Sequence, residues 1–152
     1  MMLVVAPLLL SLTLAAGLEQ TKPDFSGKWT KIRTSPGEAV ETMTISQTAD
    51  TLTVVDEGNQ SPSGLIRRVQ KLDGSESKNV IKPANAPEYV QVSTTTWDGD
   101  ALVTRTPVRD VAAPFVLTTV MRLEGATLVI NVTQTSEATG AVLNPYTVRY
   151  SK

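Results

Sequence analysis

Short runs of alternating residues, separated by turn-forming residues, constrain the fold of this 152-residue chain more than any other feature. The runs are rich in Val, Thr and Ile, which pack well on a pleated surface. Their period of two places successive side chains on opposite faces, as in β-strands. We expect strands at residues 27–33, 40–48, 51–57, 64–72, 89–97, 101–108, 115–123, 127–135 and 142–150, and a further one at 77–81.

Turn chemistry between these runs predicts how the strands are connected. Glycine supplies positive φ and aspartate bonds its own backbone, which suits short hairpins. Strands joined in sequence by tight turns predict an all-β, antiparallel up-and-down meander, and closing it into a barrel would remove its exposed edges. Proline-containing stretches at 57–63, 79–88 and 107–114 are expected to be longer loops at one end. The turn pairs are Ala49-Asp50, Asp73-Gly74, Asp98-Gly99, Glu124-Gly125 and Thr139-Gly140.

The first 17 residues are typical of a secretory signal peptide. Residues 3–14 are almost wholly apolar, small residues follow at 15–17, and Glu19 is the first charged residue. The apolar stretch is shorter than the roughly 20 residues that a membrane-spanning helix needs. We expect cleavage, no membrane span after it, and an exported protein that is periplasmic or secreted. A retained anchor is the alternative, because no Lys or Arg precedes the apolar stretch. A linker at 18–24 and one β-barrel domain at 25–152 would follow.

Composition argues against several classes of function. The chain has no His and no Cys, which excludes His-based triads, Cys-His pairs and His-rich metal sites. Its 14 Lys and Arg are interspersed with 15 Asp and Glu, so no basic stripe favours nucleic acid as a partner. No nucleophile or phosphate-binding motif is present. We expect no catalytic residues, no metal, no cofactor and no enzymatic activity, although two carboxylates distant in sequence could still form a hydrolase site.

The segment Gly27-Lys28-Trp29 lies at the head of the first predicted strand and resembles the start of lipocalin-like barrels. Together with the leader and the meander, the resemblance covers nearly the whole chain and is closest to small secreted bacterial lipocalin-like proteins of unassigned function. It implies an 8–10-stranded lipocalin-like barrel in which Gly27 and Trp29 are structural. It also implies that Arg149, on the last strand, stacks on the Trp29 ring in a cation–π contact.

Alternation predicts an inner face that is apolar but includes polar groups. Because buried polar atoms need partners, such a face favours a cavity that holds water or a ligand over a solid core. The alternative is that these groups lie near wet barrel ends. Arg67 and Arg68 are adjacent, so one would point inward and could grip a carboxylate or phosphate, unless both are solvated on an edge strand. The predicted ligand-binding residues are Phe115, Leu117, Met121, Tyr146 and Arg67.

These features favour an exported lipocalin-like protein that binds a small hydrophobic or amphiphilic molecule in its barrel. The alternative is a protein–protein interaction module, with a filled barrel, that acts through loops such as the proline-rich stretch 79–88. A cavity of roughly 300 Å³ or more would favour the first interpretation.

Overall fold

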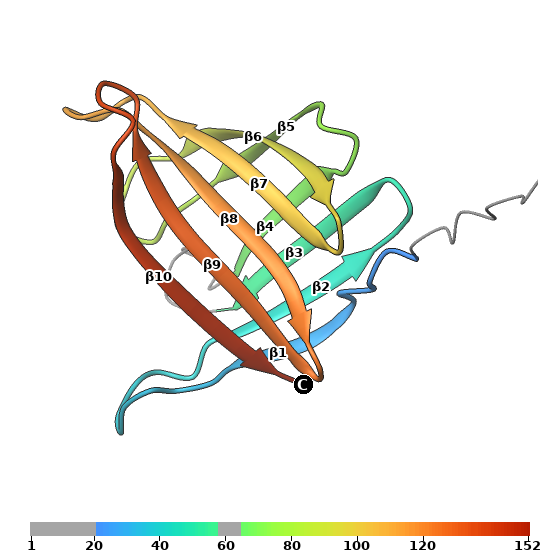
Figure 1. The fold of residues 1–152 in the computed structure, drawn as a ribbon. Coiled ribbons are helices and arrows are strands. Elements are labelled where there is room, and N and C mark those ends of the chain that lie inside the picture. Colours follow the sequence, from blue (N-terminus) through green and yellow to red (C-terminus); the bar gives the residue numbers. More distant parts are fainter. Residues whose placement is uncertain (1–20, 58–64) are drawn as a thin grey trace, which may run out of the picture.

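The computed structural model describes residues 21–57 and 65–152 (Figure 1). The predicted signal peptide, the first part of the linker and most of the predicted loop at 57–63 lie outside these residues. The described part forms one ten-stranded antiparallel sheet. Its strands are β1 (Gly27–Lys31), β2 (Thr42–Gln47), β3 (Thr51–Glu57), β4 (Leu65–Lys71), β5 (Glu76–Ile81), β6 (Tyr89–Asp98), β7 (Ala101–Val108), β8 (Phe115–Glu124), β9 (Thr127–Ser136) and β10 (Val142–Ser151).

The strand order is β4-β3-β2-β1-β10-β9-β8-β7-β6-β5. Each strand pairs with its sequence neighbour, except that β4 does not pair with β5, and β1 also pairs with β10. The predicted all-β, antiparallel up-and-down meander is therefore confirmed, and the expected strand at 77–81 is β5. The first two predicted strands are too long by a few residues, because β1 ends at Lys31 and β2 begins at Thr42.

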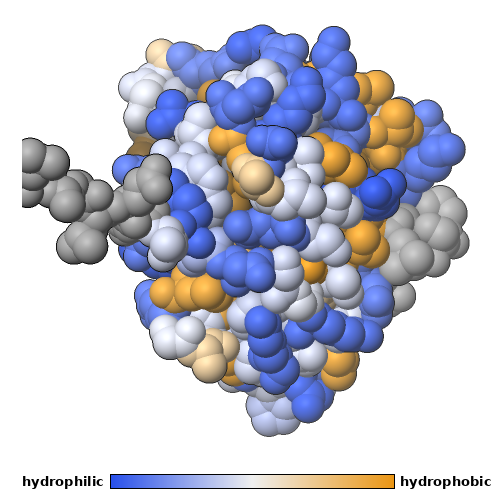
Figure 2. All heavy atoms as spheres, turned by 90° about the vertical axis from the view of Figure 1, so that its right-hand side faces the viewer, coloured by the Kyte–Doolittle hydropathy of each residue, from blue (hydrophilic) through white to orange (hydrophobic). Residues whose placement is uncertain are grey.

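Loop lengths differ between the two ends of the sheet. The β6–β7 and β8–β9 hairpins turn through Gly99 and Gly125, both with φ of 61°, a conformation that favours glycine. The β6–β7 turn lies on the right of Figure 1 and the β8–β9 turn lies at the bottom beside the C-terminus, whereas the longer loops at 32–41, 82–88 and 109–114 lie on the left. The sheet thus has a short-turn end and a long-loop end. The face at the short-turn end is mainly hydrophilic, with small separate hydrophobic areas (Figure 2).

The two edge strands of the ladder, β4 and β5, meet through side chains. Among residues 21–57 and 65–152, no backbone ladder joins these strands. Instead, the Asn79 side chain accepts a hydrogen bond from Val69 N (2.7 Å) and donates one to Val69 O (3.0 Å). Ser77 Oγ accepts a further bond from Lys71 N (2.8 Å). The backbone hydrogen bonds between strands therefore define a curved meander. They do not close it into a barrel.

The hydrophobic core fills the short-turn end. Trp29 is 2% exposed, and its Nε1 donates a hydrogen bond to Phe25 O at 2.9 Å. The Phe25 ring stacks on Trp97, with ring centroids 6.0 Å apart. The Gln47 side chain accepts a bond from Phe25 N and donates one to Pro23 O, which holds the segment before β1 against β2. The core cluster is Phe25, Trp29, Met43, Ile45, Leu52, Val54, Leu72, Leu102 and Leu128.

The cation over the Trp29 ring is Lys152, and the predicted stacking by Arg149 is wrong. Lys152 Nζ lies 4.8 Å from the ring centroid, whereas Arg149 Nη1 pairs with Glu124 Oε2 at 2.8 Å. Alternation along β10 explains the difference, because Arg149 is exposed on the outer face. Gly27 has φ of 143°, and a Cβ there would lie 2.8 Å from Lys152 Cε. The glycine therefore leaves room for the lysine to cross β1.

Candidate functional site

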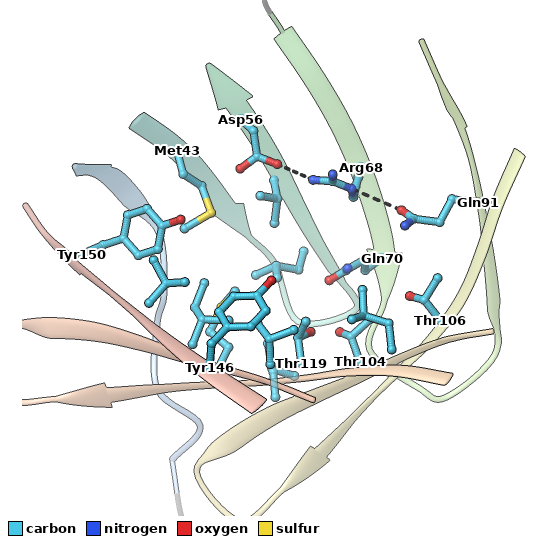
Figure 3. Close-up of a pocket in the computed structure, with 18 residues that line it drawn as sticks. Met43, Asp56, Arg68, Gln70, Gln91, Thr104, Thr106, Thr119, Tyr146 and Tyr150 are labelled. Carbon is cyan, nitrogen blue, oxygen red and sulfur yellow. Dashed lines mark hydrogen bonds and ion pairs between the residues drawn. The ribbon is translucent and has the colours of Figure 1, made fainter. Parts of the chain in front are cut away.

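A cavity of about 290 Å³ lies inside the curved sheet (Figure 3). Its described lining comes from every strand except β1 and β5. One part of this lining is apolar, because the inward positions of β8, β9 and β10 carry Leu, Met, Ile and Val. The apolar side chains that are not in the core cluster are Leu117, Met121, Ile130, Val132 and Val148.

A row of polar side chains crosses the opposite part of the cavity. Arg68 lies between Asp56 and Gln91 (Figure 3). Arg68 Nη1 forms an ion pair with Asp56 Oδ2, and Arg68 Nε donates a hydrogen bond to Gln91 Oε1 at 3.2 Å. In the β3–β4 register, Asp56 is opposite Ile66 and Arg68 is opposite Val54. Asp56 and Arg68 are thus diagonal neighbours on one face, a spacing that long side chains can bridge.

Neutral hydrogen-bonding groups extend this polar row. Gln70 of β4 and Thr106 of β7 lie toward the Gln91 side of the cavity, whereas Thr104 of β7 lies beside Thr119 and Tyr146 (Figure 3). Thr104 Oγ1 lies 2.8 Å from Thr95 Oγ1 in a hydrogen bond that either hydroxyl could donate. The cavity is therefore amphipathic. Its ion-paired and amide groups come from β3, β4 and β6, and the lining from β8, β9 and β10 is mainly hydrocarbon but includes the hydroxyls of Thr119, Tyr146 and Tyr150.

A second hollow, of about 660 Å³, continues from the cavity toward the long-loop end. The two spaces share Asp56, Arg68, Tyr146 and Tyr150, so they form one path from the interior to the loops. We call this second hollow the vestibule. Tyr89 also lines it, so all three tyrosines of the chain are in its lining.

An ion-pair network at the base of the β1–β2 loop borders the vestibule. Lys31 Nζ lies 2.8 Å from Glu38 Oε1 and 3.2 Å from Glu41 Oε1, and Glu41 is in the vestibule lining. The hydrogen bond from Lys31, with a second from the Thr34 backbone N–H, lowers the pKa of Glu38 to about 2. Glu38 is therefore ionised at neutral pH and continues to pair with Lys31.

The predicted ligand-binding residues divide into two groups. Leu117, Met121 and Tyr146 line the cavity, as the alternation in β8 and β10 predicts. Phe115 is half-buried at the start of β8 and is not in the described lining. Arg67 is exposed on the outer face, so the inward arginine is Arg68, and the choice of Arg67 for the cavity is wrong.

Sequence reasoning missed the polar row, although part of its signal was present. Buried Leu72 sets the phase of β4, and counting back by two from it gives Gln70 and Arg68 as inward positions. The same count in β3 places Asp56 on the face of buried Leu52 and Val54. Gln91 carries a weaker signal, because its alternates Ser93 and Thr95 are polar and only Trp97, at the far end of β6, is a half-buried apolar residue.

Tyr150 is expected to titrate unusually late. Burial raises its pKa from 10.0 to about 12, and the nearby carboxylates Asp56 and Glu41 add to the shift. Because the folded-state pKa is above the unfolded value, the stability from neutral Tyr150 is complete below pH 10 and lost as the pH rises toward 12. Ultraviolet titration of the phenolates should show a component near pH 12 that is missing from Tyr150→Phe. The same late component in the variant would contradict this assignment.

Across 21–57 and 65–152, no three His, Cys, Asp or Glu side chains are grouped so as to hold a metal ion. That part of the chain also has no helix with the length and apolar character needed to cross a membrane. No protein-family model matches the chain, and no curated protein is significantly similar to it in sequence.

Proposed function

We propose that this chain is an exported, lipocalin-like barrel protein that holds a small apolar or amphiphilic molecule inside its curved sheet. The observation that supports this most is the cavity of about 290 Å³ with its vestibule. Its volume is close to the roughly 300 Å³ at which small-molecule sites begin. The side-chain bonds between β4 and β5 would complete the enclosure without a backbone ladder.

The division of the interior supports this function. Large side chains such as Trp29 and Phe25 fill the short-turn end, which would give the container a rigid floor. Toward the long-loop end, the inward side chains leave space, and the vestibule provides a route to it. A protein selected only for stability would gain by filling this space, because cavities cost packing energy.

Filling the cavity with a larger side chain tests the location of the site. Leu117→Trp places an indole in the cavity, and Val116→Trp makes the same kind of change at the next residue, on the other face of β8. With N-phenylnaphthylamine as a neutral fluorescent probe, we expect Leu117→Trp to weaken binding by about ten-fold or more, a loss of about 1.4 kcal/mol. Val116→Trp should bind like the wild type.

Circular dichroism spectra and melting curves would establish that both variants are folded. If Leu117→Trp is folded and binds the probe as tightly as the wild type, the cavity is not the binding site. Met121→Arg and Tyr146→Ala change other parts of the same lining and give independent readings.

A second candidate function is docking of a partner protein at the long-loop end. The observation that favours it is the exposure of apolar side chains around the vestibule, where Val40 is 61%, Tyr89 49% and Tyr146 54% exposed. Exposed aromatic groups of this kind are common at protein interfaces. This function would not require a ligand in the cavity, so the two candidates differ in whether the purified protein contains a small molecule.

A further inference from the structure

The charges in the cavity cancel. Of the described residues that line it, Asp56 and Arg68 alone are charged, and they form an ion pair with each other. Their side chains are 36% and 27% exposed, so neither is fully hydrated. Arg68 Nε also donates a hydrogen bond to Gln91, so two of the five N–H donors of the guanidinium are engaged and its one positive charge is shared with Asp56. The cavity therefore offers neither a free cation nor a free anion to a ligand.

A charged head group would be costly in this cavity. A carboxylate at Arg68 would compete with Asp56 for the single positive charge, and an ammonium at Asp56 would compete with Arg68 for the single negative charge. Removing one member of a partly desolvated ion pair is unfavourable, and so is burying an ion without a countercharge. The Asp56–Arg68 pair therefore disfavours the binding of both anionic and cationic head groups.

An uncharged polar group has partners that leave the pair intact. Gln70, Thr104 and Thr106 supply amide and hydroxyl groups in the same lining, and each can donate or accept a hydrogen bond. The facing side chains Leu117 and Met121 supply apolar contact for a hydrocarbon portion. A neutral molecule with one hydrogen-bonding end is therefore complementary to both sides.

The vestibule adds carboxylates rather than cations to the path. Glu41 and Glu57 line it, whereas their partners Lys31 and Lys28 are not in the described lining. Asp56 and Arg68 line the vestibule as well, so an anionic ligand there would meet three carboxylates and one guanidinium. The net charge of this described lining is negative, which disfavours anions in the same direction as the ion pair.

We infer that the cavity selects an uncharged amphiphile, such as a long-chain alcohol or amide, over fatty acids and other ions. Its neutral polar end would bind Gln70, Thr104 or Thr106, and its hydrocarbon would lie against Leu117 and Met121. This inference rests on the proposed function, because it specifies the ligand class of the same cavity.

Three probes with the same alkyl chain test this selectivity: n-octanol, octanoate and n-octylammonium. Each would compete with N-phenylnaphthylamine at neutral pH in the wild-type protein. We expect n-octanol to bind about ten-fold more tightly than either ion. If octanoate or octylammonium binds as tightly as n-octanol, the inference is overturned and the proposed function stands. If neither the fluorescent probe nor any competitor binds, the proposed function itself fails.

Variants of the ion pair separate its effect from general hydrophobicity. Asp56→Asn frees Arg68 and should improve octanoate binding about ten-fold, and Arg68→Gln frees Asp56 and should do the same for octylammonium. The double variant removes both charges and should again prefer n-octanol. Folded single variants that leave the three affinities in the wild-type order and ratio would overturn the role of the pair. If either variant is unfolded, the wild-type series decides alone.

Discussion

Trp29→Ala is expected to lower the free energy of unfolding by about 3–5 kcal/mol, the usual cost of removing a fully buried aromatic side chain. Trp29 is 2% exposed and lies in the core cluster at the short-turn end. The change leaves a cavity, removes the indole N–H that binds Phe25 O, and removes the ring below Lys152. Because domains of this size are stable by only about 5–15 kcal/mol, the variant should be close to unfolding at physiological temperature.

Urea unfolding followed by circular dichroism measures this loss directly. Trp29→Phe is the matched control, since it keeps an aromatic ring and loses only the N–H donor and part of the volume. We expect Trp29→Phe to lose less than half of the free energy of unfolding that Trp29→Ala loses. A Trp29→Ala protein within about 1 kcal/mol of the wild type would contradict the structural role of Trp29.

Asn79→Leu is expected to cost about 2–4 kcal/mol, because it leaves two backbone groups of β4 without partners. Asn79 is 8% exposed, and its amide binds both the N–H and the C=O of Val69. In effect, one side chain replaces a ladder contact between β4 and β5. Its loss would also expose the edge of β4, and exposed edges pair with other chains, so the variant should self-associate as its concentration rises.

Hydrogen exchange at the Val69 amide gives a residue-level test of the Asn79 bond. We expect faster exchange in Asn79→Leu, and a smaller loss of stability, about 1 kcal/mol, in Ser77→Ala, which removes one acceptor from Lys71 N. Asn79→Asp retains the oxygen that accepts from Val69 N and should keep most of the protection. Unchanged exchange at Val69 in Asn79→Leu would show that this side chain does not hold the two edges together.

The strands could be predicted because one face of each is buried and the other is wetter. In β3, the alternates Leu52 and Val54 are buried, and the glycine turns at Gly99 and Gly125 mark where the chain reverses. The ends of the strands depend on local contacts and are harder to predict. For example, β1 ends at Lys31, two residues before the predicted end at residue 33. The order of the strands followed from the short connections, since consecutive antiparallel strands pair.

The contact between β4 and β5 could not be predicted, because its pattern in the sequence is inverted. Ser77 and Asn79 occupy the buried positions of β5, whereas Val80 is 53% exposed. The prolines at 83 and 87 suggested a loop that began at Asn79, whereas β5 continues to Ile81. The reason for the inversion is visible only when β4 is adjacent, since these side chains bind its backbone.

Prediction of the site was limited by phase and by distance along the chain. Leu117 and Met121 were identified because β8 has a clear apolar face. Choosing Arg67 over Arg68 was a phase error of one residue, which reverses the face. The pairing of Arg68 with Gln91 joins β4 to β6 through the curvature of the sheet, which no local pattern encodes. The contact of Lys152 with the Trp29 ring was missed as well. Lys152 follows the last residue of β10, so the alternation in that strand does not place its side chain.

Native mass spectrometry of the protein purified from its own source tests the ligand-binding proposal most directly. The native mass is compared with the mass after denaturation, which also shows whether the leader has been removed. We expect a reproducible extra mass that disappears on denaturation and that belongs to a small uncharged amphiphile. A native mass equal to that of the chain alone, in protein whose cavity also fails to bind N-phenylnaphthylamine, would contradict the proposal and favour docking of a partner at the long-loop end.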